Sequence, residues 1–305
     1  MEHFADRLAA AVRRCRTAAV VGIDPVLERL PPELRARNGL AAAVEAIERF
    51  SMGLIDCVAP HVPAVKINSA FFEALYAPGV AAYYRCVQHA HGAGLLVIGD
   101  IKRGDIGSTA QLYARGHLET PHFDDVSAAS IPDAVTLAGY LGKNAVQPFI
   151  DVSVPAGRGM FVLVRPSDPG ADKVHEFGVG PRFYEHMAGL VQQWGSQPGC
   201  IGVSGLSCVG AVVAPKDPTS TRRLRERMSN AWWLVPGFGA QGATAEACRP
   251  CFRPDGLGAL VNASRSVIYA FAQPENQKQF GADWRGAVAA AAAAFAREVR
   301  DMAGL

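Results

Sequence analysis

Eight short apolar runs alternate with amphipathic stretches along the chain, and this alternation constrains the fold more than any other feature of the sequence. The runs are rich in Val, Ile, Leu and Ala, as expected of parallel strands that are buried on both faces. They span residues 17–24, 62–68, 95–102, 133–139, 159–167, 209–215, 231–239 and 257–265. Eight such strands with helical connections predict a (β/α)8 barrel, of the kind called a TIM barrel.

The chain of 305 residues is long enough for one large α/β barrel or for two ordinary domains. A doubly wound sheet is the main rival fold, but it usually needs fewer strands. Because the sequence shows no internal repeat and no low-complexity linker, we predict a single domain over residues 1–305. Its catalytic core covers about residues 17–270, and the Ala-rich stretch 286–299 predicts a terminal helix.

The net charge is only +2, from 30 basic and 28 acidic residues, which favours neither nucleic acid nor membrane as a partner. The Arg-rich run 221–228 predicts a solvated helix face. The amino terminus has no apolar signal segment, and no apolar stretch reaches the length of a membrane span. Seven cysteines without a disulfide framework predict reduced thiols in a cytoplasmic protein. Cys248 and Cys251 form a lone C-x-x-C without further ligands, so we interpret them as incidental rather than metal-binding or redox-active.

Charged side chains of alternating sign crowd the end of the third apolar run, in the stretch "GDIKRGDIGSTA". Asp100 and Lys102 are two residues apart on a strand and therefore share a face. Buried charges are costly unless they are paired. The alternating signs predict a chain of ion pairs with the members Lys66, Asp100, Lys102 and Asp105. Gly104 is expected to let the backbone turn and bring Asp105 round. A purely stabilising ion network is the alternative, which is weak because buried ion pairs add little net stability.

Polar residues also follow other apolar runs, at the ends that form the catalytic face of such a barrel. Asp24 ends the first run, Ser167 the fifth and Arg265 the eighth, and residues 165–181 predict a long loop on this face. The Gly-rich stretch "PGFGAQG" follows the seventh run. Loops after strands seven and eight commonly bind phosphate, and backbone N–H groups together with Arg265 suit a phosphate dianion. A plain turn beside a surface arginine is the alternative.

The stretch "VIGDIKRGDIGSTA" resembles the Asp-x-Lys-x-x-Asp-Ile-x-x-Thr signature of the orotidine 5′-phosphate decarboxylases. The stretches "VVGIDP", "AVKINSAFFE", "LVPGFGAQG" and "VNASRSVIYA" occur in the order seen in the longer bacterial, type 2 branch of that family. The resemblance covers about residues 4–275. It implies a homodimeric (β/α)8 barrel that converts orotidine 5′-monophosphate to UMP and CO2, a step of pyrimidine biosynthesis, with no metal and no other cofactor.

The resemblance also assigns roles to individual residues. Lys102 matches the proton donor to C6, within a network that includes Lys66, Asp100 and Asp105. Asp105, Ile106 and Thr109 match positions that reach the neighbouring site across the dimer interface. The remaining matches are Asp24 for the ribose, Ser167 for the pyrimidine, and Gly239, Gln241 and Arg265 for the phosphate. Three stretches depart from the family pattern: "RPSDPG" at the fifth run, "TLAGYLG" at the fourth and "AVVAPKDP" at the sixth.

Two other functions fit part of the pattern. A related sugar-phosphate decarboxylase shares Asp-x-Lys-x-x-Asp but uses Mg²⁺, and the continuation from Ile106 to Thr109 favours the orotidylate reaction instead. A catalytically inactive, nucleotide-binding barrel would have no use for Lys102 beside two carboxylates. Loss of CO2 from an sp² carbon, by contrast, leaves a carbanion that a fixed cation can stabilise and then protonate.

Overall fold

The structure is a computed structural model that describes residues 1–35, 38–120, 122–238 and 244–305. Eight parallel strands follow one another in chain order around a closed barrel, in which β1 pairs with both β2 and β8. The strands are β1 (Ala19–Ile23), β2 (Ala64–Asn68), β3 (Leu96–Arg103), β4 (Ala134–Leu137), β5 (Gly159–Arg165), β6 (Ser207–Val213), β7 (Ala231–Val235) and β8 (Ala259–Ala263). Each strand overlaps one predicted run, so the predicted fold is confirmed.

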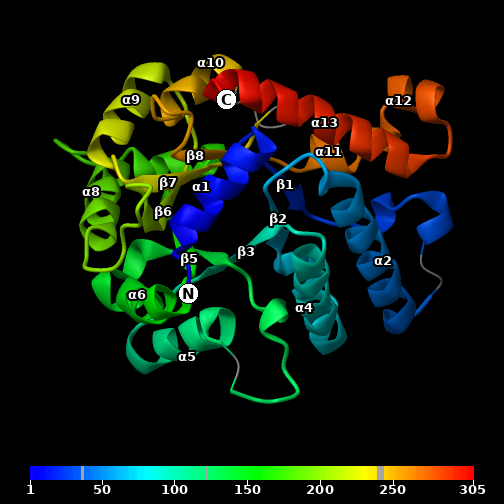
Figure 1. Cartoon of the computed structure of the whole chain (residues 1–305), viewed down its shortest axis with the longest axis horizontal. Coiled ribbons are helices and arrows are strands. Elements are labelled where there is room, and N and C mark those ends of the chain that lie inside the picture. Colours follow the sequence, from blue (N-terminus) through cyan, green and yellow to red (C-terminus); the bar gives the residue numbers. More distant parts are fainter. Residues whose placement is uncertain (36–37, 121, 239–243) are drawn as a thin grey trace.

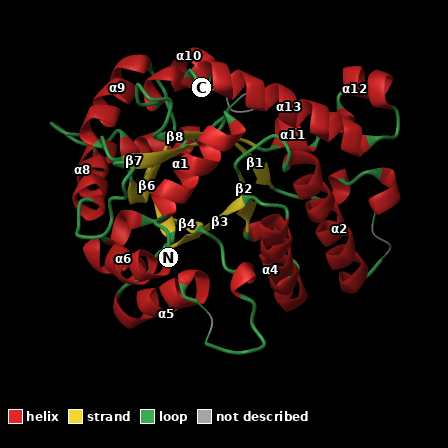
Figure 2. Cartoon of the chain, viewed as in Figure 1, coloured by secondary structure: helices red, strands yellow, loops and turns green. Residues whose placement is uncertain are grey.

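Helices surround the strands, as Figures 1 and 2 show. The α-helices are α1 (Phe4–Cys15), α2 (Leu40–Val58), α3 (Ala70–Glu73), α4 (Tyr76–Gly92), α5 (Gly107–Leu118), α6 (Lys143–Ala156), α7 (Asp172–His175), α8 (Phe183–Gly195), α9 (Pro218–Arg227), α10 (Ala245–Cys248), α11 (Arg265–Ile268), α12 (Pro274–Phe280) and α13 (Trp284–Ala303). The strands are almost wholly buried, which explains why their sequences lack polar alternation. The Ala-rich stretch lies within α13, as predicted, and packs against α2 and β1.

Helix α1 crosses the opening at the amino-terminal ends of the strands (Figure 1). The ring of Phe4 meets that of Phe161 edge to face at a centroid distance of 6.2 Å. Arg7 donates to the carboxylate of Asp133 at 2.7 Å, and His91 lies 2.8 Å from the other oxygen of that carboxylate. Asp133 also accepts the backbone N–H of Val97 at 2.8 Å. This buried carboxylate therefore joins α1 and α4 to the strands at the closed end of the barrel.

Helix α9 carries the Arg-rich run, and the prediction of a solvated face is wrong for Arg225. Its side chain is buried and donates to backbone carbonyls, among them those of Cys251 at 2.7 Å and Gly258 at 2.7 Å. The guanidinium lies 3.9 Å from the ring centroid of Trp233. Arg225 is buried because its planar donors match several backbone carbonyls that the fold brings together from separate parts of the chain, which sequence alternation does not reveal.

None of the helices in the described part of the chain combines the length and apolar character needed to cross a membrane. All seven cysteines are free thiols. Cys248 and Cys251 are both buried at the end of α10, and burial raises the pKa of the Cys248 thiol to about 12. Their thiols are therefore packed as small apolar groups in the neutral form.

Candidate active site

A cavity of about 230 Å³ opens at the carboxyl-terminal ends of the strands. The predicted site residues that line it are Asp24, Lys66, Asp100, Lys102, Ser167 and Arg265. It is also lined by Asn68, Thr136, Leu163, Pro166, Val212, Leu234, Pro236, Gly237, Phe238, Asn262 and Ser264. The carboxyl ends of the strands thus bring together polar residues from distant parts of the sequence, as predicted for a barrel enzyme.

A chain of ion pairs forms one wall of the cavity. The Nζ of Lys66 lies 2.7 Å from Oδ2 of Asp100 and 3.8 Å from Oδ1 of Asp24. The Nζ of Lys102 lies 2.5 Å from Oδ1 of Asp100. Strand pairing explains the proximity, because Lys66 and Asp100 lie on the adjacent strands β2 and β3, where Asn68 is the register partner of Asp100. The predicted alternation of charge is therefore present for three of its four members.

The charged neighbours of Asp100 and Lys66 keep these two buried groups ionised. Burial alone would raise the pKa of Asp100, but the neighbouring ammonium groups of Lys66 and Lys102 hold it well below its usual range. Burial alone would lower the pKa of Lys66, but Asp100 and Asp24 outweigh this and raise it. At neutral pH the cavity wall therefore carries fixed charges of both signs.

Lys102 differs from its partners in exposure and in backbone conformation. Its side chain is 50% exposed at the cavity, whereas that of Asp100 is 6% exposed. Its φ of 43° lies in the left-handed region, which is unfavourable for a side chain other than glycine. The pairing of β3 with β4 shifts register between Gly99 and Arg103, so Lys102 lies in a bulge. Bulges re-aim side chains next to active sites, and this one accompanies an ammonium group presented to the cavity.

Thr136 is a polar residue of the site that the sequence did not single out. Its hydroxyl donates to Oδ1 of Asp100 at 2.9 Å and accepts the backbone N–H of Lys102 at 3.0 Å. The sequence signal was its place near the end of the fourth apolar run, the same criterion that identified Asp24 and Ser167. Asn68, Asn262 and Ser264 satisfy the same criterion.

Asp105 does not join the ion pairs within its own chain. Its carboxylate accepts the backbone N–H of Ile106 at 2.8 Å, and among the described residues it forms no salt bridge. Asp105, Ile106 and Thr109 lie outside the described lining of the cavity. The predicted role of Gly104 also changes. Between residues 102 and 107, the positive φ values are those of Lys102 and Gly107 (55°) and not that of Gly104. An added Cβ at Gly104 would lie 3.0 Å from the backbone oxygen of Ala138.

The residues predicted for an anion site after β7 and β8 also reach this cavity. Gly237 follows β7 with a φ of 81°, and the exposed Arg265 begins α11 after β8. Both line the cavity, which confirms that the loops after the last two strands converge there. The predicted ligands Gly239 and Gln241 lie outside the described residues. Arg265 thus adds a guanidinium group to the lining of the cavity.

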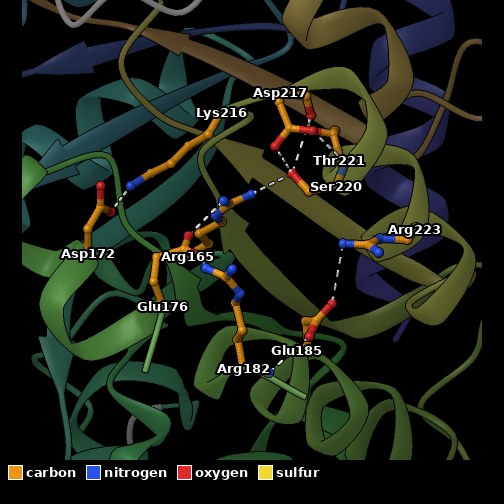
Figure 3. Close-up of polar contacts among 10 residues, drawn as sticks. All are labelled: Arg165, Asp172, Glu176, Arg182, Glu185, Lys216, Asp217, Ser220, Thr221 and Arg223. Atoms are coloured by element: carbon orange, nitrogen blue, oxygen red, sulfur yellow. Dashed lines mark hydrogen bonds and ion pairs between the residues drawn. The ribbon is translucent and has the colours of Figure 1, made fainter. Parts of the chain in front are cut away.

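The loop that carries Ser167 is fixed by a second charged network (Figure 3). Arg165, the last residue of β5, is buried and donates to Glu176 at 2.7 Å and to the hydroxyl of Ser220 at 2.8 Å. Glu176 also pairs with Arg182. The predicted loop 165–181 thus lies on the active face, contains the short helix α7, and is tied to α9 two residues before Ser167.

These features define a (β/α)8-barrel protein whose cavity is lined by a chain of ion pairs and by the guanidinium group of Arg265. The model of the family described as "Orotidine 5'-phosphate decarboxylase / HUMPS family" matches residues 40–278. A protein of Rhodopirellula baltica described as orotidine 5′-phosphate decarboxylase is 38% identical over 296 residues, covering 95% of this chain and 97% of that one. One of Caldicellulosiruptor bescii with the same description is 32% identical, covering 89% and 91%.

Solved structures agree with these sequence relatives. The structure of Leishmania donovani OMP decarboxylase superimposes with a TM-score of 0.74 at 28% identity, covering 99% of both chains. The chain therefore belongs to the orotidine 5′-phosphate decarboxylase family. The resemblance carried by the signature around Lys102 is confirmed at the level of the family and of the fold.

Proposed function

We propose that the chain decarboxylates orotidine 5′-monophosphate to UMP and CO2, as a carboxy-lyase of pyrimidine biosynthesis. The observation that carries this function is the chain of ion pairs from Asp24 through Lys66 and Asp100 to Lys102 on the cavity wall. A half-exposed ammonium group held at 2.5 Å by a buried carboxylate suits a reaction that develops negative charge at one carbon. The relatives from Rhodopirellula baltica and Caldicellulosiruptor bescii carry the same activity in their descriptions.

The chemical step follows from these charges. The bond between C6 and the carboxylate breaks, CO2 leaves, and the electron pair stays on C6. Lys102 stabilises this carbanion with its positive charge and then donates a proton from Nζ to C6, leaving a neutral amine that solvent reprotonates. Asp100 fixes the ammonium group and faces the substrate carboxylate, whose charge it disfavours until that charge is lost. Lys66 balances Asp100 from the opposite side.

The other lining residues bind the parts of the nucleotide that do not react. Arg265 and the loop after β7, which includes the predicted ligands Gly239 and Gln241, hold the phosphate. Asp24 contacts the ribose and Ser167 the pyrimidine. Binding energy from the phosphate is then available to position the base against Lys102. The reaction as proposed uses no metal and no organic cofactor.

The active unit is a homodimer, in which Asp105, Ile106 and Thr109 complete the site of the neighbouring subunit. Helix α5 supports this arrangement, because it packs against α6 and carries exposed apolar side chains: Ile106 just before it is 56% exposed and Leu112 is 66% exposed. In the proposed dimer, the partner subunit covers these side chains. Asp105 is half-buried and makes no salt bridge with the described residues of its own chain, so it is available to a second copy.

The loss of orotidylate absorbance in the presence of the purified chain tests this function. We expect turnover by the wild-type chain, and at least ~10³-fold slower turnover by Lys102→Ala, the scale for losing a general acid together with its charge. Lys278→Ala, which removes an exposed lysine of α12, is the matched control and is expected to keep full activity. Near-normal turnover by Lys102→Ala would contradict the role of that residue.

Treatment with EDTA separates this reaction from the Mg²⁺-dependent alternative. Turnover of orotidine 5′-monophosphate is expected to survive chelation and dialysis unchanged. Activity that disappears with EDTA and returns with Mg²⁺ would favour a sugar-phosphate decarboxylase of the same family. Binding of UMP without any turnover by the wild-type chain would indicate the inactive nucleotide-binding barrel.

A further inference from the structure

Thr136 lies opposite a register shift in the pairing of β3 with β4, which the ion pairs alone do not explain. In the pairing of β3 with β4, Gly99 is the partner of Val135 and Arg103 is the partner of Leu137. The three residues from Asp100 to Lys102 therefore face one residue of β4, Thr136. A strand that bulges in this way leaves backbone groups without ladder partners.

The hydroxyl of Thr136 supplies the missing partner. It accepts the backbone N–H of Lys102 at 3.0 Å, where φ is 43°, and it donates its own proton to Oδ1 of Asp100 at 2.9 Å. Thr136 is 1% exposed, so water does not readily replace these bonds. One hydroxyl thus connects the backbone of the exposed lysine with the carboxylate that holds its ammonium group.

We propose that Thr136 is a positioning residue for decarboxylation, which holds Lys102 in its left-handed conformation and fixes the rotamer of Asp100; this role rests on the proposed function. The same Oδ1 of Asp100 accepts from Thr136 and from Lys102 Nζ at 2.5 Å. Loss of the hydroxyl frees the carboxylate to rotate and leaves the N–H of Lys102 without its partner. The ammonium group then loses its fixed position against C6, although every charge remains present.

Thr136→Val tests this role, because valine keeps the β-branched shape and removes only the hydroxyl. We expect kcat to fall about 10- to 100-fold, the scale of one hydrogen bond to a charged group. We expect KM and the Kd for UMP to change less than about threefold, since Thr136 acts through Lys102 and Asp100 rather than by binding substrate. Thr136→Ser restores the hydroxyl and is expected to recover most of kcat.

Thr17→Val is the matched control. Thr17 is equally buried, and its hydroxyl donates to the carbonyl of Ala296 at 2.8 Å and accepts the backbone N–H of Ala19 at 3.3 Å, outside the cavity. We expect Thr17→Val to lower thermal stability as Thr136→Val does, while the kcat of Thr17→Val stays at the wild-type value. A parallel fall in kcat for both variants would reduce Thr136 to a structural role.

Other outcomes overturn the positioning role in distinct ways. A wild-type kcat in folded Thr136→Val refutes it, while turnover by the wild-type chain leaves the proposed function intact. A large rise in KM and in the Kd for UMP with little change in kcat would make Thr136 a substrate ligand instead. If Thr136→Val does not fold, the comparison of Thr136→Ser with Thr136→Ala decides the question. An equal kcat in those two variants would contradict the positioning role of Thr136.

Discussion

Replacement of Lys66 by methionine is the sharpest test of the buried charge chain. Methionine preserves much of the side-chain volume, so the main change is the loss of one positive charge. Lys66 is 7% exposed and lies between Asp100 at 2.7 Å and Asp24 at 3.8 Å. Removing one partner of a buried pair typically costs about 3–5 kcal/mol, because the other charge stays buried without compensation. We expect Lys66→Met to lose free energy of unfolding on this scale at pH 7.

The loss of unfolding free energy in Lys66→Met depends on pH, and the ionisation of Asp100 determines whether the loss grows or shrinks as the pH falls. In the wild-type chain, the lysines hold the pKa of Asp100 well below its ordinary value, which stabilises the folded state at neutral pH. That stabilisation is present above the pKa of the unfolded chain and is lost as the pH falls through the lowered folded value. In Lys66→Met, burial opposes ionisation of Asp100 with only Lys102 close by. The deficit is therefore largest at pH 7 and shrinks towards pH 5, as the variant protonates its carboxylate.

Urea unfolding at pH 7 and pH 5, followed by the fluorescence of the buried Trp232 and Trp233, measures both effects. Lys278→Ala serves again as the control and is expected to change the unfolding free energy by less than about 0.5 kcal/mol. A deficit of equal size at both pH values would mean that Lys66 contributes packing rather than charge. No deficit at all would refute the paired, buried chain.

Three further predictions concern other parts of the molecule. Arg265→Ala is expected to weaken the binding of UMP, measured by calorimetry, about 10- to 100-fold, which is the scale of a charged hydrogen bond. The binding of uridine is expected to change little, and equal losses for both ligands would contradict a phosphate contact. A mixture of Lys102→Ala and Asp105→Ala subunits is expected to recover roughly a quarter of wild-type activity, because about half of the dimers are mixed and each mixed dimer holds one intact site. Mass spectrometry confirms that the subunits have exchanged. A fully exchanged but inactive mixture would place Asp105 in the site of its own chain. Burial would raise the pKa of Asp133, but His91 and Arg7 lower it to about 2. About 2 kcal/mol of unfolding free energy is therefore expected to be lost as the pH falls from about 4 to about 2. Asp133→Asn is expected to remove this loss at acid pH, and an unchanged loss in that variant would contradict the prediction.

The barrel and the members of the ion-pair chain could be predicted from local patterns in the sequence. Continuous apolar runs predict buried parallel strands whatever their partners are, so all eight were found. Asp100 and Lys102 share a strand, and the two-residue period predicted their proximity, although it gave no sign of the bulge at Lys102. Lys66 and Asp24 follow from their positions at strand ends, because the carboxyl ends of all strands converge in a barrel.

The remaining features depend on pairing between distant segments, which no local pattern encodes. Thr136 acquires its role from the register shift between β3 and β4, and the sequence of either strand alone gives no sign of that shift. Arg225 looks like a surface residue until the carbonyls of Cys251 and Gly258 are brought to it from elsewhere in the chain. Gly104 was interpreted as a turn, although close packing against Ala138 accounts for it. Each requires the assembled barrel.

The left-handed backbone at Lys102 is a local strain that the ion pair with the buried Asp100 offsets. Glycine tolerates a φ of 43° at little cost, whereas a lysine there costs on the order of 1 kcal/mol. A glycine at position 102 would relieve this strain, but it would also remove one of the two cations that pair with the buried Asp100. Because the loss of a partner to a buried charge costs more than the strain, selection for heat resistance is expected to keep the lysine. Any effort to engineer a hardier form of this enzyme must hold position 102 fixed and seek its gains elsewhere, for example at the closed end of the barrel.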